Sequence, residues 1–339
     1  MKNIILNIIK QLLIIISALI VGVWVFGPLE PAKINVNFEN QLSEKDLDKY
    51  LSQEEKNFND ITAGVEKRII WANKVGEKTP FSIIYIHGFS ATSEEVRPVP
   101  DRIANRITAN LYYTRLTGHG RGPRAMSEPR VIDWMSDMTE AIAIGRRIGH
   151  KIIIISTSTG STLSAAAALN PIAHKHIAGL IFISPNFGIN NPLARLLTWP
   201  AARWWVPLIA GKMRHSTPRN RFHSKFWTTS YPTIATIPMA AVVKEVAKQN
   251  FEKVSIPALF FYSLDDKVVD PNKTKKIASK WGGGNNKIIN VTMTEADDIF
   301  SHIIAGDIVS PNQTTYAIEA MVKWIRRLPH YTRKTQEYP

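Results

Sequence analysis

Cysteine is absent from this 339-residue chain, and its absence removes several kinds of chemistry at once. Without cysteine there is no disulfide framework, no thiolate nucleophile and no Cys-ligated zinc site. The absence fits an oxidising compartment, where a free thiol is a liability, but cytosolic proteins also lack cysteine. Cysteine usage therefore excludes these chemistries without assigning a compartment.

Acidic residues are scarce as well: 28 Asp and Glu stand against 42 Lys and Arg, which gives a formal net charge of +14. Such an excess favours an anionic partner, namely nucleic acid, a membrane surface or an acidic substrate. Residues 187–250 hold much of it, with nine Lys/Arg and one acid. No nucleic-acid-binding motif accompanies these charges, so we expect no nucleic acid partner; an ordinary solvated surface is the alternative.

Motifs for metal and nucleotide chemistry are also missing. The chain has no HExxH pair and no Walker loop, and the GHGRG segment at Gly118–Gly122 lacks the dinucleotide-binding spacing. We therefore expect no metal and no cofactor.

The longest apolar run lies at the N-terminus. Ile4–Phe26 is long enough to cross a bilayer if Lys10 extends toward the headgroups, and Trp24 suits a membrane interface. Lys2 and Lys10 precede the run, so the positive-inside rule predicts a cytoplasmic N-terminus and a globular domain on the extracytoplasmic (periplasmic or extracellular) side. We predict that residues 1–27 are a membrane anchor.

Two other interpretations of this run remain. A signal peptide cleaved after Gly27 is the main one, although Pro28 disfavours processing there. A buried core helix is the weaker one. Residues 28–60 are polar and mixed and are assigned to a connector, with a short helix at Leu47–Phe58 capped by Ser43.

Strand-like and helix-like segments then alternate, which predicts an α/β fold with a mostly parallel central sheet covered by helices. The expected strands are 67–72, 81–86, 110–116, 152–155, 176–184, 256–263 and 288–292, and the expected helices are 94–108, 131–148, 162–169 and 314–327. The core comprises residues 61–186 and 251–329, followed by a basic tail at 330–339.

Residues 187–250 interrupt this alternation. The stretch holds four tryptophans, several prolines and no strand pattern, and it is too long for a loop and too apolar for disorder. We predict an inserted helical cap.

A nucleophile is expected between the four-isoleucine strand and the alanine-rich helix that follows. A sharp strand-to-helix turn requires small residues two positions before and two after the nucleophile, and Ser156 and Gly160 meet that requirement around Ser158. The helix N-terminus also favours developing negative charge. A plain helix cap is the alternative for this Ser/Thr-rich run.

Acyl transfer also requires N–H donors for the oxyanion, and a base. His87-Gly88 directly follows the strand FSIIYI, so the backbone amides of Phe89 and Thr159 are the expected donors. In α/β hydrolytic enzymes with the nucleophile on such a strand-to-helix turn, the catalytic residues follow one another along the chain in the order Ser, acid, His. After Ser158, acids cluster within 264–270, and only His302 and His330 follow, the latter in the basic tail. His302 is therefore the expected base.

The ordered set of motifs resembles the α/β hydrolases, specifically the monoacylglycerol lipase, lysophospholipase and carboxylesterase group. The matching pieces are IIYIHGFS, RLTGHG, Asp133-Trp134 with Asp137, ISTSTGST, FFYSLDDKVVDP and SHIIAGD, from about Phe81 to the C-terminus. Two family glycines are replaced by Ser156 and Ser263.

The resemblance implies that Asp266 is the acid of the triad, with Asp265 as the second choice and Asp270 as the third. It implies that His119 shapes a loop without taking part in the chemistry.

The expected function is a serine hydrolase that cleaves a carboxylic ester through an acyl-enzyme. Caps in this group cover the acyl pocket, so the resemblance and the anchor together suggest a lipid-like or hydrophobic acyl ester, with a basic, Trp-rich cap on the membrane. The tryptophans are alternatively the core of the cap. Amide or thioester hydrolysis, acyl transfer, and a non-catalytic membrane-tethered binding protein are the alternative functions.

Overall fold

The computed structural model describes residues 2–38, 42, 46–329 and 331. The expected cap residue Ser43 and all of the predicted 330–339 tail except Tyr331 lie outside the described residues.

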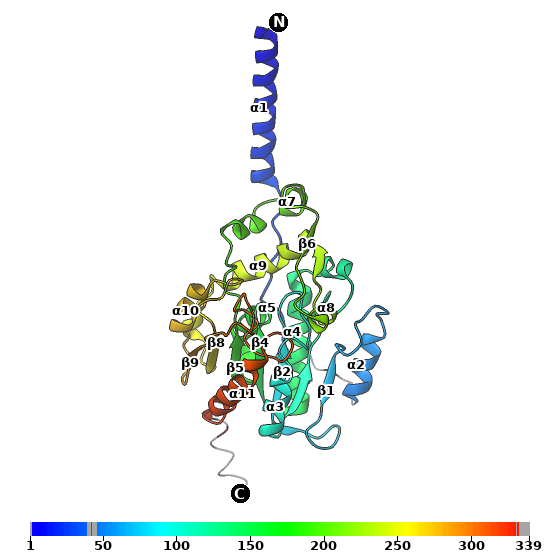
Figure 1. Ribbon diagram of the computed structural model, residues 1–339, viewed down its shortest axis with the longest axis vertical. Helices are drawn as coiled ribbons and strands as arrows, with labels where there is room; N and C mark the ends of the chain where they lie inside the picture. The colour runs from blue at the N-terminus through cyan, green and yellow to red at the C-terminus, as the bar shows by residue number, and fades with distance from the viewer. Residues whose placement is uncertain (1, 39–41, 43–45, 330, 332–339) are drawn as a thin grey trace.

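A seven-stranded sheet forms the centre of the molecule, in the order β1-β3-β2-β4-β5-β8-β9 (Figure 1). The strands are β1 (Arg68–Ile70), β2 (Thr79–Ile86), β3 (Asn110–Tyr113), β4 (Gly149–Thr157), β5 (Ile177–Ile183), β8 (Ala258–Tyr262) and β9 (Lys287–Asn290). Every neighbouring pair is parallel except β1 with β3. The predicted mostly parallel sheet is confirmed.

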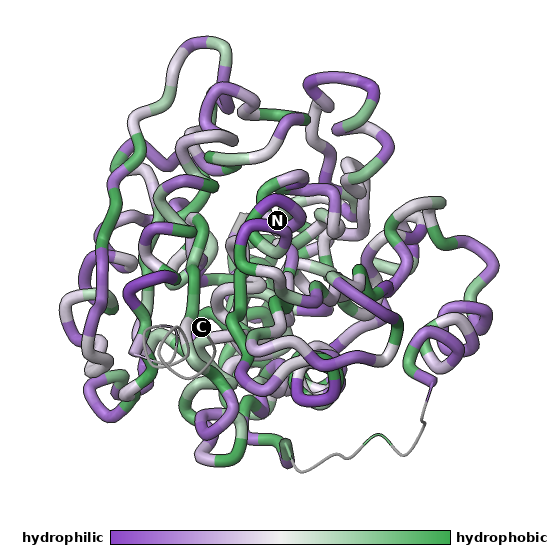
Figure 2. Tube along the Cα trace, turned by 90° about the horizontal axis from the view of Figure 1, so that it is seen from below, coloured by the Kyte–Doolittle hydropathy of each residue, from purple (hydrophilic) through white to green (hydrophobic). Residues whose placement is uncertain are grey.

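The isoleucine run of β4 shows why this sheet is buried on both faces. Successive side chains of a strand point to opposite sides. Ile152 and Ile154 belong to one apolar cluster, and Ile153 and Ile155 to the other. Hydrophobic segments accordingly gather in the middle of the body, with hydrophilic ones mostly on its outer loops (Figure 2).

Helices cover both faces of the sheet. The cluster around Ile154 contains apolar residues of α4 (Val131–Ile148), α5 (Thr159–Ala168) and α10 (Pro271–Ser279). The cluster around Ile153 contains those of α3 (Val99–Arg106) and α11 (Pro311–Ile325). Shorter elements are α6 (Pro171–His174), η1 (Pro123–Ser127) and η4 (Phe251–Lys253).

The segment before the first strand packs against this core. Helix α2 (Leu47–Glu55) buries Leu47 and Leu51, and its N-cap is Asp46, which accepts from the backbone of Lys49. The N-cap is therefore Asp46 and not the expected Ser43, because Asp46 immediately precedes the first turn and accepts from one of the N–H groups that are free there.

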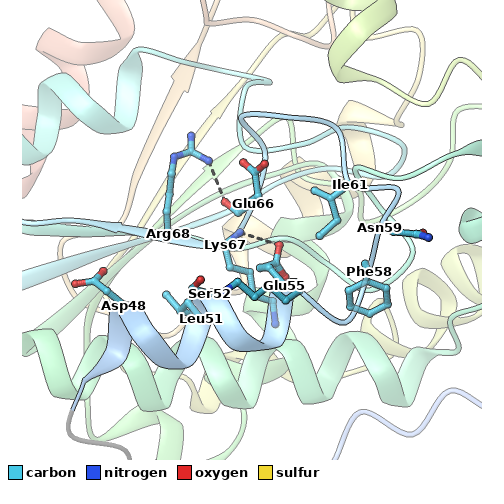
Figure 3. A pocket seen from close by; sticks show the side chains of 11 residues that line it. Asp48, Leu51, Ser52, Glu55, Phe58, Asn59, Ile61, Glu66, Lys67 and Arg68 are labelled. Carbon is cyan, nitrogen blue, oxygen red and sulfur yellow. Dashed lines mark hydrogen bonds between the residues drawn. The ribbon is translucent and has the colours of Figure 1, made fainter.

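Glu55, at the end of α2, is joined to Lys67, directly before β1, and to Arg115, which follows β3. It accepts a hydrogen bond from Lys67 N at 3.1 Å and forms a buried pair with Arg115 at 2.8 Å. A pocket of about 450 Å³ lies between α2 and β1 beside this contact (Figure 3). No histidine and no residue of the expected triad lines it, so this pocket lies apart from the expected catalytic residues.

Residues 187–250, for which a cap is predicted and which are called the cap below, contain η2 (Pro192–Thr198), α7 (Ala202–Ala210), α8 (Arg221–Phe226), η3 (Thr233–Ala235) and α9 (Thr236–Val246). The cap also contains an antiparallel pair of strands, β6 (Met213–His215) and β7 (Ser230–Pro232). The expectation that this region has no strand is wrong. Each strand has three residues and no buried side chain, so neither has an apolar pattern to detect.

Helix α1 (Lys2–Phe26) projects from the body next to α7, at the end opposite α11 (Figure 1). None of its most apolar window is buried, which contradicts the buried-core-helix interpretation. Its length and composition suit a membrane span or a signal sequence equally. At its foot Trp24 packs edge-on against Trp199 at 4.7 Å, and Ala201 N donates to Pro28 O at 2.7 Å.

Candidate active site

Ser158 lies on the sharp turn between β4 and α5, with φ 50° and ψ −118°. Non-glycine residues rarely adopt such a conformation, and it persists only where the surroundings fix it. Ser158 N donates to Ile183 O, and Ser158 O accepts from Ser161 N and Asn186 N. The turn is therefore held from β5 and from its own helix.

The small residues around Ser158 are required sterically. A Cβ on Gly160 would lie 2.4 Å from Ile86 O and 2.6 Å from His87 O. Ser156 is fully buried against β5, in which Phe182 is its register partner. The close approach of α5 to the end of β2 explains why this turn needs glycine at position 160.

Three chemically complementary side chains meet at this turn. His302 Nε2 lies 3.1 Å from Ser158 Oγ, and His302 Nδ1 lies 2.8 Å from Asp266 Oδ2. The other oxygen of Asp266 accepts from Val268 N and Val269 N at 2.8 and 2.9 Å. All three side chains are nearly buried.

The other two candidate acids after strand β8, Asp265 and Asp270, are not bonded to His302 in the described structure. Asp265 is exposed, and Asp270 caps α10 by accepting from Asn272 N at 2.9 Å. Of the three acids weighed from the sequence, the structure brings only Asp266 to His302. His330 lies outside the described residues.

The pKa of His302 is raised above its usual 6.5. Burial by itself lowers this pKa, but the charge and hydrogen bond of Asp266 raise it by more, with smaller contributions from Glu95 and Asp298. An imidazole in this setting is suited to receive a proton from Ser158 and to be stabilised as the cation.

A second carboxylate holds the backbone of the histidine loop, and no sequence pattern indicated it. Asp298 Oδ2 accepts from His302 N at 3.0 Å and from Ile303 N at 2.9 Å. Its other oxygen lies 3.0 Å from a guanidinium nitrogen of Arg219 in the cap. Arg219 of residues 187–250 therefore contacts the loop that carries His302, the expected base.

The loop after β2, residues 87–90, is called the oxyanion loop. His87 Nε2 accepts from Leu116 N at 3.0 Å, so the neutral ring carries its proton on Nδ1 and donates it to Gly88 O at 2.9 Å. Burial, with the neighbouring His119, lowers the pKa of His87 well below 6.5 and keeps the ring neutral. This bond orients the peptide that carries Phe89 N–H.

The two expected oxyanion donors are both available. Within the described chain, neither Phe89 N nor Thr159 N donates to a protein acceptor. Thr159 is the first residue of α5, where N–H groups have no partner inside the helix and the helix dipole favours an anion.

His119 lies beside this loop without reaching the triad. Burial lowers its pKa to about 4, and its Nδ1 lies 3.1 Å from Thr117 O. Its ring contacts are with His87, Phe89 and Trp134. The cap closes over the same place, because Thr228 N donates to Ser90 O at 2.7 Å and Tyr231 packs edge-on against Phe89.

Comparison with known proteins gives a consistent picture. The family described as serine aminopeptidase, S33, matches residues 78–291. A thermostable monoacylglycerol lipase from Bacillus sp. (strain H-257) is 23% identical over 195 residues, which are 58% of this chain and 74% of that protein.

Solved structures share the fold. One belongs to LipS and LipT, two metagenome-derived lipolytic enzymes, and matches with a TM-score of 0.61 at 17% identity, over 79% of this chain and 100% of that one. A soluble variant of monoglyceride lipase from Saccharomyces cerevisiae, in complex with a substrate analogue, matches with a TM-score of 0.54 at 12% identity, over 77% and 91%.

Proposed function

Because the chain belongs to the serine aminopeptidase S33 family of α/β hydrolases, we propose that it hydrolyses carboxylic esters with Ser158 as nucleophile, His302 as base and Asp266 as the acid that orients it. The observation that carries this proposal is the hydrogen-bonded sequence of Ser158 Oγ, His302 and Asp266, at 3.1 and 2.8 Å.

In the first half of the reaction, Ser158 Oγ attacks the ester carbonyl carbon while His302 Nε2 takes the hydroxyl proton. Asp266 keeps Nδ1–H directed toward itself and stabilises the imidazolium. The carbonyl oxygen becomes an oxyanion that accepts from Phe89 N–H and Thr159 N–H. The tetrahedral intermediate then expels the alcohol, which takes the proton back from His302, and leaves an acyl-enzyme.

In the second half, water gives a proton to His302 and attacks the acyl carbon. The same oxyanion donors serve the second tetrahedral intermediate. Its collapse releases the carboxylic acid and returns the proton to Ser158.

The charge of the cap supports ester hydrolysis over the aminopeptidase activity in the family's name. An aminopeptidase has to bind the α-ammonium of its substrate, which calls for a nearby carboxylate. Residues 187–250 hold a single acid, Glu245, and it is engaged by Lys248 at 3.0 Å. A basic cap of this kind disfavours a cationic substrate, and the lipolytic relatives support an ester.

We further propose that residues 1–27 anchor the protein in a membrane and that the cap faces the bilayer. Helix α7 lies at the foot of α1 (Figure 1). In helix α7 the side chains of Trp204, Leu208 and Ile209 are 62%, 79% and 80% exposed. Leu29, in the segment that follows α1, is 62% exposed. Exposed apolar side chains next to a spanning helix and a basic surface suit a lipid interface, and with it a lipid-like acyl ester.

Two assays test the reaction. The purified protein should hydrolyse p-nitrophenyl esters, with kcat/KM rising from acetate toward longer acyl chains, and should leave aminoacyl p-nitroanilides intact. If the protein hydrolysed only the aminoacyl anilides, it would be an aminopeptidase and the proposed ester hydrolysis would be wrong. No turnover of any ester, amide or thioester would favour a non-catalytic binding protein.

The membrane arrangement has its own tests. Protein lacking residues 1–27 should bind anionic liposomes at low salt through the cap, and absence of binding would remove the membrane role of the cap. The lack of native cysteine makes topology testable by single substitution. In intact cells, a membrane-impermeant maleimide should label Lys323→Cys and leave Asn3→Cys unlabelled; the reverse pattern would overturn the orientation.

A further inference from the structure

Glu95 is a buried carboxyl group that the proposed mechanism does not use. Its exposure is 2%, and its Oε2 accepts from Gly88 N at 2.8 Å and from Tyr85 OH at 2.9 Å. A Cβ added to Gly88 would lie 2.7 Å from Glu95 Oε1 and 3.1 Å from Ser158 Cβ. The α-carbon of Gly88 is therefore flanked by the Glu95 carboxyl group on one side and the nucleophile on the other.

The same group connects to the turn that carries Ser158. Tyr85 OH lies 3.0 Å from Thr157 Oγ1, and Thr157 directly precedes Ser158. Since Tyr85 donates to Glu95, its oxygen accepts the Thr157 hydroxyl proton. A continuous buried network thus runs from Gly88 N through Glu95 and Tyr85 to the residue before the nucleophile.

Burial makes a carboxyl group here energetically costly. It raises the pKa of Glu95 to about 7, although the hydrogen bonds from Gly88 and Tyr85 and the nearby His302 lower that pKa in part. The adjacent Glu94 turns away and pairs with Arg68 and Arg97. Removal of this acceptor would leave Gly88 N–H buried without a partner, which is destabilising, so the carboxyl group ties the backbone of this loop in place.

We propose that Glu95 is a positioning residue that holds the oxyanion loop in register with the nucleophile. His87 fixes the carbonyl of Gly88, and Glu95 fixes the amide of Gly88. Glu95 thereby holds the peptide before Gly88, and His87 holds the peptide after it, which carries Phe89 N–H. With both peptides fixed, the backbone at Gly88 directs Phe89 N–H toward the developing oxyanion. This inference rests on the proposed serine-hydrolase function, because it assigns a role to Glu95 only in oxyanion binding.

Glu95→Met tests the proposal, because methionine has a similar length and no strong acceptor. Loss of a whole oxyanion donor costs about 10²–10³ in kcat. A donor that is displaced but present should cost less, so we expect a loss of about tenfold to a hundredfold in kcat with KM changed less than threefold. The Ki of a boronic acid inhibitor, which mimics the tetrahedral intermediate, should rise by the same factor as kcat falls.

Two further variants separate hydrogen bonding from charge and from folding. Glu95→Gln keeps an oxygen that accepts both bonds and should retain kcat within a few-fold. Tyr85→Phe removes the bonds of Tyr85 to Glu95 and to Thr157 but leaves the bond between Glu95 and Gly88 N, and it should give an intermediate loss in kcat. If Glu95→Met does not fold, Tyr85→Phe still tests the network.

Asp137→Leu is the matched control. Asp137 is partly buried and also accepts from a backbone amide and a hydroxyl, those of Thr117, but within the described residues no hydrogen bond joins it to the oxyanion loop or the triad. The Asp137→Leu substitution should lower Tm and leave kcat unchanged.

The outcomes are distinguishable from failure of the proposed function, since active-site titration of the wild type with a fluorophosphonate reports that function directly. With a labelled wild type, an unchanged kcat in Glu95→Met would overturn the positioning role. A loss in Glu95→Gln as large as in Glu95→Met would also overturn it, because charge and not hydrogen-bond acceptance would then be what matters.

Discussion

Gly160→Ala tests the geometry of the nucleophile turn with opposing effects of known size. Gly160 is the second residue of α5, and alanine in a helix is favoured over glycine by about 0.8–1 kcal/mol. The added Cβ, however, would lie 2.4 Å from Ile86 O, 2.6 Å from His87 O and 2.9 Å from Ile86 C. These are backbone atoms of a central strand, which cannot rotate away as a side chain would.

Overpacking of a rigid site costs about 1–3 kcal/mol, and backbone contacts this short belong at the upper end. After the gain in helix propensity, a net loss of about 2 kcal/mol in the free energy of unfolding remains. At about 2 °C per kcal/mol, the low end for large domains, Tm should fall by about 4 °C. Because the displaced backbone leads into the oxyanion loop, kcat should fall as well.

Calorimetry and ester kinetics measure both effects. Gly122→Ala is the matched control, because a Cβ there meets nothing within 4 Å and its φ of −62° suits alanine. A Gly160→Ala protein as stable and as active as the wild type would refute the close approach of α5 to β2.

Three further results are expected. The raised pKa of His302 places the acid limb of the kcat/KM profile above pH 6.5, since only the neutral imidazole accepts the Ser158 proton; a limb below that pH would contradict the pairing. Asp266→Asn should lower kcat by several orders of magnitude, because the amide does not hold the Nδ1–H tautomer, whereas Asp265→Asn, at an exposed position, should change it little. Glu30→Gln should destabilise the protein by about 1–3 kcal/mol at pH 7, less than for a fully buried pair because Arg130 is half exposed.

The pH dependence of the Glu30 effect has a definite sign. Burial alone raises the pKa of Glu30, but hydrogen bonds and charges from Arg203 and Arg130 lower it below 4.5 overall. The stabilisation by the ionised group is therefore present above pH 4.5 and is lost as pH falls through the lowered pKa. Thermal scans should show the gap between wild type and Glu30→Gln narrowing below pH 4.5, and a constant gap would contradict the ion pairs.

The sequence predicted those parts of the molecule that follow from local pattern. Strand β4 was predictable because its four isoleucines form a fully apolar run, and Ser158 because a sharp turn needs small flanking residues such as Gly160. Asp266 was chosen over its neighbour Asp265 only by the resemblance to a family. In the structure, Asp266 is buried and Asp265 is exposed, a difference that no local pattern encodes.

The supporting contacts were not predictable in this way. Asp298 and Glu95 act by accepting from backbone N–H groups, and any Asp or Glu in a loop has the same appearance in the sequence. Glu30 meets Arg130 and Arg203, which are 100 and 173 positions away. Contacts of this kind depend on how distant segments pack, and composition and periodicity carry no information about that.

The central claim is that the Ser158 hydroxyl is the nucleophile activated by His302. The most direct measurement is covalent labelling of the purified protein by a fluorophosphonate, followed by mass spectrometry of the modified peptide. Wild type and Ser161→Ala, which alters a buried serine of the same turn, should be labelled on Ser158, and Ser158→Ala should not be labelled. Undiminished labelling of Ser158→Ala, or a label on another residue of the wild type, would contradict the assignment of the nucleophile.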